Sequence, residues 1–493
     1  MLKIILTIGA FQALAIVISF FRTKLVAVLA GPEGVGIIST IDQVVQAASY
    51  FSALSLPFAS VRYLSKAHSR GFESFKQTYS NFLKALLILS LTGTTVAAGV
   101  VFFRPQMLGP EAVKYKVLLG IALLSLPTMI LSGFFMQTLA AAQKPKLSSV
   151  LTLITGATLA AAGVIGIAVG GITGLYAGTG LVGIVLTVST LVYLQKALNL
   201  PLYNRAASFC DELKRSPDII PFAFMVYLGA LASSLSLLVV RYVTLTNYGE
   251  ESAGFLQAAI ALSLALGMIL NPANGLYLTP IMNRDIAKEE KIKAAVEFEK
   301  RLAIILALAA MPIVLFPDLM INILFSSEFI VVAQYVFLFI AAQCILQIAG
   351  VHQALLIGFD DLKAFSLFTC AGHVSLGLIA WLLIPTLGIL GAGIAFLAAY
   401  SILFGTTLLR LRLKHNFLMP VPLTLLMLYG LAAMLLAGSA SAHYDGWNIV
   451  SIASRIGIFS LFAASLLLYL TKKERGFIYD LLNKIGVKKI ANA

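Results

Sequence analysis

Charge is scarce in this sequence, and the scarcity decides its class. Lys, Arg, Asp and Glu make up 11% of the 493 residues, and 60% of the residues are hydrophobic. A soluble domain carries roughly 25% charged residues. Apolar runs of about 20 residues recur from end to end, each long enough to cross a hydrocarbon core roughly 30 Å thick. The longest polar stretches, 197–216 and 282–300, are too short for a soluble domain, so composition excludes a soluble globular protein.

Cysteine is also scarce. Cys210 lies in a polar segment, whereas Cys344 and Cys370 lie inside apolar runs. An odd number at these spacings fits neither a disulfide framework nor a metal site, so we expect three reduced, structural cysteines. The first apolar run is not typical of a cleaved signal peptide, because Arg22 and Lys24 interrupt its end.

Hydropathy predicts an all-α, polytopic membrane protein with about fourteen transmembrane helices. Each span should be helical, because lipid offers no partner for an open backbone edge. Pro57, Pro127 and Pro272 lie inside spans and predict kinks there. The spans lie near 4–29, 36–64, 79–103, 116–142, 147–170, 173–196, 218–246, 252–281, 300–325, 329–357, 363–386, 389–411, 418–440 and 447–471.

The basic residues predict the orientation. With the N-terminus in the cytoplasm, 28 of the 35 Lys and Arg residues lie on the cytoplasmic side, 3 on the opposite side and 4 inside spans. This positive-inside bias places both termini in the cytoplasm. It also explains the net charge of +14 without a nucleic-acid partner, because anionic headgroups lie at that membrane face. The basic tail, 472–493, has apolar residues at helical spacing and is either an amphipathic surface helix or a solvated tail.

An internal repeat divides the chain. Four landmarks recur at offsets of 216 to 219 residues: Arg22 with Arg241, Gly36 with Gly254, Gln137 with Gln353, and the sequence GITG at 171–174 with GILG at 388–391. Repeats of this kind are typical of secondary transporters, whose sites lie at the repeat interface. We therefore expect two six-helix lobes, 1–200 and 201–415, followed by two further spans within 416–471.

Among the ionisable residues of the predicted spans, five lie at depth, where each costs roughly 2.5–3.5 kcal/mol on insertion scales and indicates function. They are Arg22, Lys24, Asp42, Arg241 and Arg455. The first four share nearly one depth, counted from the turns between spans. Asp42 can neutralise Arg22 or Lys24 as a structural ion pair, and Arg455 can snorkel to the headgroups.

Four basic residues against one acid leave a net intramembrane charge of +3, which predicts an anionic ligand. Guanidinium donors match phosphate oxygens, so we expect Arg22 and Arg241 to face each other across a cavity between the lobes. Further polar residues at span depth either line that cavity or link helices to one another. They are Gln137, Gln257, Asn271, Asn274, His352, Gln353 and His373.

The segment FRTKLVAVLAGPEGVGI in the first two spans and VRYLSK at the end of the second resemble the Wzx-type polysaccharide flippases. These belong to the multidrug/oligosaccharidyl-lipid/polysaccharide (MOP) exporter superfamily. The resemblance implies a two-lobe transporter of the bacterial inner membrane that moves an undecaprenyl-diphosphate-linked oligosaccharide, such as an O-antigen unit, to the periplasmic leaflet. It implies cationic cavity residues, onto which Arg22, Lys24 and Arg241 map. Its partners would be this cargo, membrane lipids and polysaccharide polymerase machinery.

Three alternatives remain. A lipid II flippase has a similar polyprenyl-diphosphate cargo, and in that branch an extra pair of spans helps to hold the lipid tail, a groove that Arg455 would then flank. A drug/cation antiporter needs membrane-embedded carboxylates, and Asp42 is alone among cations. A polytopic polymerase needs a sizeable catalytic loop, and the pair Asp360–Asp361 lies in a tight turn that favours Asp for local hydrogen bonding. We expect no cofactor, while coupling to H⁺ or Na⁺ through Asp42 stays open.

Overall fold

The computed structural model describes all residues except 1, 109–112, 203, 205–206, 274–277, 283–285, 442–448 and 467–493. The described residues form helices and no strand, which confirms the predicted all-α class. The expected tail helix within 472–493 and the expected ligand Asn274 lie outside them. In chain order the elements are α1 (Leu2–Ala53), α2 (Leu56–Ser69), α3 (Phe72–Phe103), η1 (Pro105–Leu108), α5 (Lys116–Ala122), η2 (Leu123–Ser125), α6 (Leu126–Ala141), α7 (Pro145–Leu198), α8 (Phe209–Arg215), α9 (Ile219–Ala273), α10 (Thr279–Met282), α11 (Lys288–Leu315), α12 (Pro317–Leu324), η4 (Ser327–Gln334), α13 (Val336–Gly358), α14 (Leu362–His415), α15 (Val421–Ser441) and α16 (Ile449–Leu466).

Four of these elements are hairpins of two helices. α1, α7, α9 and α14 are each interrupted by a glycine with positive φ: Gly31 (64°), Gly171 (58°), Gly249 (82°) and Gly388 (58°). Glycine populates this region readily because it has no Cβ atom. The breaks match in pairs, Gly31 with Gly249 and Gly171 with Gly388, at offsets of 218 and 217 residues. These offsets equal those of the landmarks in the sequence. We call the face of the molecule that holds the four breaks the tip face and the opposite one the basic face.

The helices account for the predicted passes. Within the described residues, eight helices are long and apolar enough to cross a membrane, or nine if the bent pair α11–α12 is one span. Four of the eight are the hairpins, and each contributes two passes. With α16, a shorter apolar helix, the described chain accommodates the fourteen spans read from hydropathy.

Three spans depart from straight helices. The second span breaks at Leu54 and Ser55, which have φ of 49° and 54°, just before Pro57. The fourth is interrupted by the 3₁₀ turn η2 before Pro127. Kinks at both prolines were expected. The span expected over 300–325 instead ends at Leu315, and α12 turns 87° away from α11.

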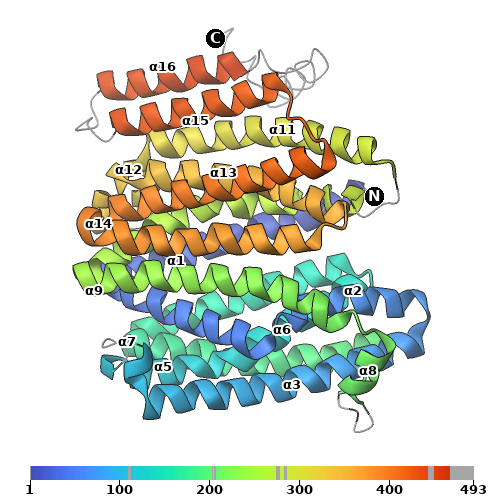
Figure 1. Ribbon diagram of the computed structural model, residues 1–493. Helices are drawn as coiled ribbons and strands as arrows, with labels where there is room; N and C mark the ends of the chain where they lie inside the picture. Colours follow the sequence, from blue (N-terminus) through green and yellow to red (C-terminus); the bar gives the residue numbers. More distant parts are fainter. Residues whose placement is uncertain are drawn as a thin grey trace.

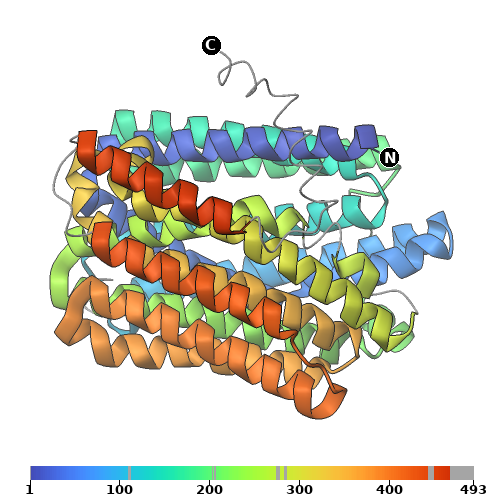
Figure 2. The same cartoon turned by 90° about the horizontal axis from the view of Figure 1, so that it is seen from above.

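The helices form two lobes. In Figure 1, α2, α3 and α5 to α7 make the lower part, α1 runs through the middle, and α9 to α14 lie beside and above it with α15 and α16 at the upper edge. One cluster of buried side chains draws on residues 26–223. The other draws on 240–466, with Ala27 and Val35 of α1. α15 packs against α11 and α13, and α16 packs against α11 (Figure 2), at the edge of the molecule opposite α7 in Figure 1, so the last two helices extend the second lobe.

Candidate substrate-binding site between the lobes

The two lobes meet along α1 and α9, the most extensive contact between any two elements. We call this contact the seam. Near the tip face its two halves mirror each other. A Cβ atom on Gly36 would overlap the carbonyl oxygen of Glu250, and one on Gly254 would overlap the carbonyl oxygen of Pro32. The repeat aligns Gly36 with Gly254 and Pro32 with Glu250, so the lobes close on each other through equivalent backbones.

Charged residues bridge the lobes beyond these glycines. Lys114 Nζ of the first lobe lies 2.5 Å from Glu250 Oε1 of the second, and Tyr115 donates a hydrogen bond to the same oxygen. A hydrogen bond with Glu250 and repulsion from its charge raise the pKa of Glu33. Burial and the hydrogen bond to Glu250 raise the pKa of Tyr115 to about 12. We call Glu33, Lys114, Tyr115 and Glu250 the tip latch.

Deeper in the seam, Asp42 lies within electrostatic range of both Arg22 and Arg241. Asp42 lies inside the seam, and its side chain is nevertheless exposed. It therefore lines a space that solvent can enter rather than a dry core. Tyr176 donates a hydrogen bond to Asp42 Oδ1 at 2.8 Å and fixes the carboxylate. We call Arg22, Arg241 and Asp42 the cation cluster, and its net charge is +1.

The two arginines keep unused donors. Arg241 is 6% exposed, and its Nη2 donates to Gln257 Oε1 at 2.6 Å. Its Nε and Nη1, and Nε of Arg22, have no hydrogen-bond partner among the described residues. Buried donors without partners cost roughly 1–3 kcal/mol each. An oxyanion placed between the lobes would satisfy them.

Lys24 points away from this cluster. Two residues along a helix correspond to a rotation of about 200°, so Lys24 and Arg22 lie on opposite sides of α1. Lys24 Nζ donates to the carbonyl oxygen of Asn322 at 2.6 Å and also to that of Phe325, both at the end of α12 in the other lobe. The structure therefore separates Lys24 from Arg22, which the sequence grouped together.

Comparison with known proteins assigns this architecture. Residues 2–285, more than half of the chain, match the family model of polysaccharide biosynthesis proteins. The chain belongs to this family. The lipid III flippases of Escherichia coli K12 and Shigella flexneri are each 22% identical to it over 390 residues, covering 77% of this chain and 91% of the relative.

Solved structures share the fold of this polysaccharide biosynthesis protein. The lipid II flippase MurJ in its inward closed conformation matches with a TM-score of 0.65 at 15% identity, covering 96% of this chain and 99% of that one. An inward-facing multidrug resistance MATE transporter of the MOP superfamily matches with a TM-score of 0.63 at 15% identity, covering 83% and 96%. The predicted MOP fold is confirmed. The chain is a multi-pass membrane protein, and the relatives and solved structures that it resembles are flippases and transporters rather than enzymes.

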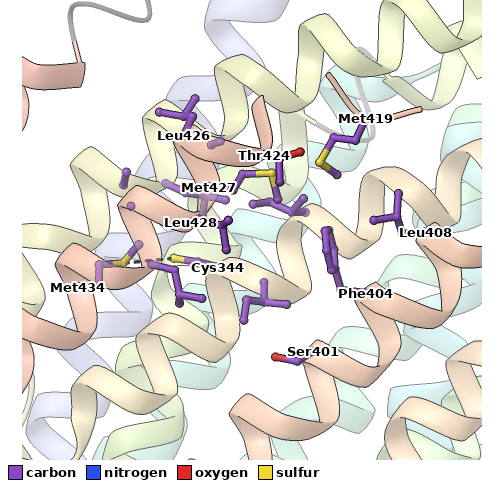
Figure 3. Close-up of a pocket in the computed structure, with 17 residues that line it drawn as sticks. Cys344, Ser401, Phe404, Leu408, Met419, Thr424, Leu426, Met427, Leu428 and Met434 are labelled. Atoms are coloured by element: carbon purple, nitrogen blue, oxygen red, sulfur yellow. Dashed lines mark hydrogen bonds between the residues drawn. The ribbon is translucent and has the colours of Figure 1, made fainter. Parts of the chain in front are cut away.

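The second lobe carries an apolar groove that hydropathy does not reveal. α15 closes it against α11, α13 and α14, and its cavity measures about 270 Å³. Figure 3 shows Phe404 of α14 facing Met427 and Leu428 of α15 across it. The remaining labelled side chains are also predominantly apolar, apart from Ser401 and Thr424. Such a lining suits a hydrocarbon chain.

Arg455 and His352 have partners inside the protein. Arg455 Nη1 of α16 lies 4.0 Å from Asp318 Oδ2 of α12, and the guanidinium lies 5.8 Å from the centre of the Phe316 ring. His352 is fully buried, with Nε2 3.1 Å from Glu299 Oε1 in the core of the second lobe. Glu299 was not predicted because it lies just outside the span expected over 300–325, and Asp318 was not predicted because it lies toward the end of that span rather than at its centre.

The other predicted polar residues spread over both lobes. Gln353 donates to Thr369 Oγ1 at 2.9 Å and so links α13 to α14. Gln137 is half-buried in α6, His373 lies 6.3 Å from the Tyr400 ring, and Asn271 lies near the end of α9. The structure thus brings Arg22, Asp42, Arg241 and Gln257 together, whereas Gln353 and His373 have their neighbours within the second lobe.

The acidic turn on the basic face is structural. Asp360 has φ of 54°, as a tight turn requires. Asp361 binds Arg410 at 3.0 Å and Lys414 and His415 at 3.2 Å each. Burial alone would raise the pKa of Asp361, but hydrogen bonds from these three side chains hold it well below its usual value.

Proposed function

We propose that this transporter is a flippase for a polyprenyl-diphosphate-linked oligosaccharide. The cation cluster carries the proposal: two arginines share one carboxylate at the seam and keep buried donors without partners. Guanidinium groups donate charge-assisted hydrogen bonds to phosphate oxygens in matching geometry. Asp42, considered for H⁺ or Na⁺ coupling, already lies between two guanidinium groups. We assign it to limiting the positive charge of the anion site.

The apolar groove supports a cargo with a long hydrocarbon tail. Burying a methylene group is worth about 0.8 kcal/mol, so the tail would contribute much of the binding energy. The groove of about 270 Å³ holds only part of a polyprenyl chain, and the rest would stay in lipid. The diphosphate would bind at the seam and the glycan would occupy the accessible space there.

The direction of transport follows from the basic residues. By the positive-inside rule the basic face is cytoplasmic, so both termini lie in the cytoplasm of a bacterial inner membrane. Cargo would enter from that face and leave at the tip face as the lobes rock about the seam. The contacts of Gly36 and Gly254 would then close the outer exit while cargo loads. An O-antigen-type repeat unit and a downstream polysaccharide polymerase fit a family of polysaccharide biosynthesis proteins.

A lipid II flippase is the second candidate, because its cargo carries the same diphosphate and tail. The MurJ fold and the groove beside α15 favour it, and the family model favours a polysaccharide unit. A cationic-drug antiporter agrees less well with the site, because the cation cluster has a net charge of +1 and would repel a cation.

The deciding experiment is to delete the protein in its host and isolate polyprenyl-diphosphate lipids. We expect a lipid-linked oligosaccharide to accumulate on the cytoplasmic leaflet, with rescue by the wild type and by the exposed-residue control Arg412→Ala, but not by Arg22→Ala or Arg241→Ala. The glycan on the accumulated lipid separates a polysaccharide unit from lipid II. No accumulation, with altered sensitivity to cationic drugs, would contradict the proposal.

A further inference from the structure

The short helix α12 touches three separate parts of the transporter. It turns 87° from α11 near the tip face. At its first turn Asp318 lies 4.0 Å from Arg455 of α16. At its last turn the carbonyl oxygens of Asn322 and Phe325 accept hydrogen bonds from Lys24 of the first lobe. Through α12, the last helix of the second lobe is therefore mechanically connected to α1.

Lys24 is held by dipoles rather than by an opposite charge. No carboxylate lies within ion-pair distance of Lys24 among the described residues. The carbonyl end of a helix carries a partial negative charge of about half an elementary charge, less in so short a helix as α12. A charged donor still gains from such a contact, so Lys24 holds the lobes together at this point. The contact is weaker than an ion pair and open to competition.

A diphosphate is the natural competitor. Its oxygens carry full negative charges and form stronger, shorter hydrogen bonds with an ammonium group than carbonyl oxygens do. Lys24 lies within about 3 Å of Arg22 along the helix axis. Lys24 leaves the opposite side of α1, so its flexible four-carbon stem has to swing around the helix to reach an anion at the cation cluster. An anion bound there would then compete with α12 for the ammonium group.

We propose that Lys24 is a positioning residue that locks the two lobes through α12 and is released when the cargo's diphosphate takes its ammonium group. The release rests on the proposed function, whereas the lock does not. In the resting state Lys24 ties α1 to the second lobe. When cargo binds, the carbonyl end of α12 loses its cation and the tip face is free to open.

The lock is tested without cargo. Spin labels at V169C and L387C, exposed positions on the tips of α7 and α14 in opposite lobes, report the distance between the lobes in nanodiscs after the native cysteines are replaced. Lys24→Gln should raise the open population roughly tenfold, the size expected for one hydrogen-bonded charge. Lys24→Arg should largely restore the closed distance. Lys196→Gln, a change at an exposed lysine in the last turn of α7, is the matched control and should leave the distance unchanged. An unchanged distance in Lys24→Gln would overturn the lock.

Release is tested with farnesyl diphosphate as the probe. Wild type should move toward the open distance on adding it, and Lys24→Gln, already open, should not respond. Binding of the probe to the wild type with no change in distance would overturn release. A wild type that does not bind it at all would count against both the release and the proposed diphosphate site, while the lock is judged by the probe-free distances alone.

Discussion

Arg22 and Arg241 occupy equivalent positions in the two halves of the chain, yet their surroundings differ. Arg22 is half-buried, whereas Arg241 is 6% exposed and donates to Gln257. The repeat aligns Asp42 with Ile260 and Lys24 with Val243, so the second half lacks both the acid and the lysine. The scaffold is therefore symmetric and the site is not. The repeat accounts for the matching backbones of the seam, and the residues that differ between the halves place the charges of the proposed anion site on one side of it.

The glycines at the seam should give the largest effect, because they are the symmetric part of this comparison. Gly36→Ala and Gly254→Ala each place a Cβ atom on the backbone of the other lobe. Overpacking costs about 1–3 kcal/mol, so each should reduce transport about tenfold or more, and by similar factors. The measurement is rescue of lipid flipping in the deletion strain.

Gly99→Ala and Gly405→Ala are the matched controls, since a Cβ atom at either position meets no atom within 4 Å. Both should transport at the wild-type rate. A strong loss of transport in Gly36→Ala together with wild-type transport in Gly254→Ala would show that the two halves of the seam are not equivalent.

The two arginines should separate transport from stability. Arg22→Gln and Arg241→Gln should both abolish transport, because each removes donors from the anion site. Arg241→Gln should also destabilise the fold by about 1.5–3 kcal/mol, the value of a hydrogen bond to a charged group, because the buried Arg241 side chain donates a partly buried hydrogen bond to Gln257. Thermal unfolding in detergent measures this difference. Equal melting temperatures for the two variants would show that their environments are more alike than the contacts indicate.

The sequence predicted the spans and the repeat because both depend on local signals. An apolar run predicts a span, and a glycine at a turn predicts a break, whatever the rest of the chain does. Depth along a helix was predictable too, which is why Arg22, Asp42 and Arg241 were expected to meet. The direction of a side chain around the helix was not. Lys24 differs from Arg22 by only two residues, and that rotation sends it across the seam to α12.

Contacts between residues far apart in the sequence were the second feature that could not be predicted. Arg455 and Asp318 are 137 positions apart and meet only because α12 turns 87° away from α11. An apolar run with one acid in it gives no sign of such a turn. The groove beside α15 is likewise a product of packing, since its residues come from four helices and an adjoining segment.

A smaller effect is expected from Tyr176→Phe. The one hydroxyl proton is shared between Asp42 Oδ1 at 2.8 Å and the carbonyl oxygen of Ile38 at 3.0 Å. The repeat aligns Tyr176 with Gly393, so the second half has no counterpart. A single lost hydrogen bond is worth about 0.5–1.5 kcal/mol, and we expect transport to fall about threefold to tenfold. Wild-type rates would show that Asp42 is held by the arginines alone.

The smallest effect should be the pH dependence of the tip latch. The mirrored glycine contacts do not titrate, so they contribute no such dependence. The pKa of Glu33 is raised by its hydrogen bond with Glu250 and by repulsion from that carboxylate. Burial would raise the pKa of Glu250, but hydrogen bonds from Lys114, Tyr115 and Glu33 lower it. Protonated Glu33 can donate to Glu250, so this contact is present below the ordinary Glu pKa and is lost as pH rises through the raised value. Closure of the tip face should therefore strengthen as pH falls from 7 toward that value, and weaken again only when Glu250 itself is protonated.

Glu33→Gln should remove this dependence, because the amide donates to Glu250 at every pH. The distance between spin labels at V169C and L387C, followed from pH 8 to pH 4, measures it. Glu297→Gln, an exposed change on α11 far along the chain from the latch, should keep the wild-type profile. If Glu33→Gln also kept it, the titrating group would lie elsewhere in the seam, and the asymmetry between the lobes would reside in the cation cluster alone.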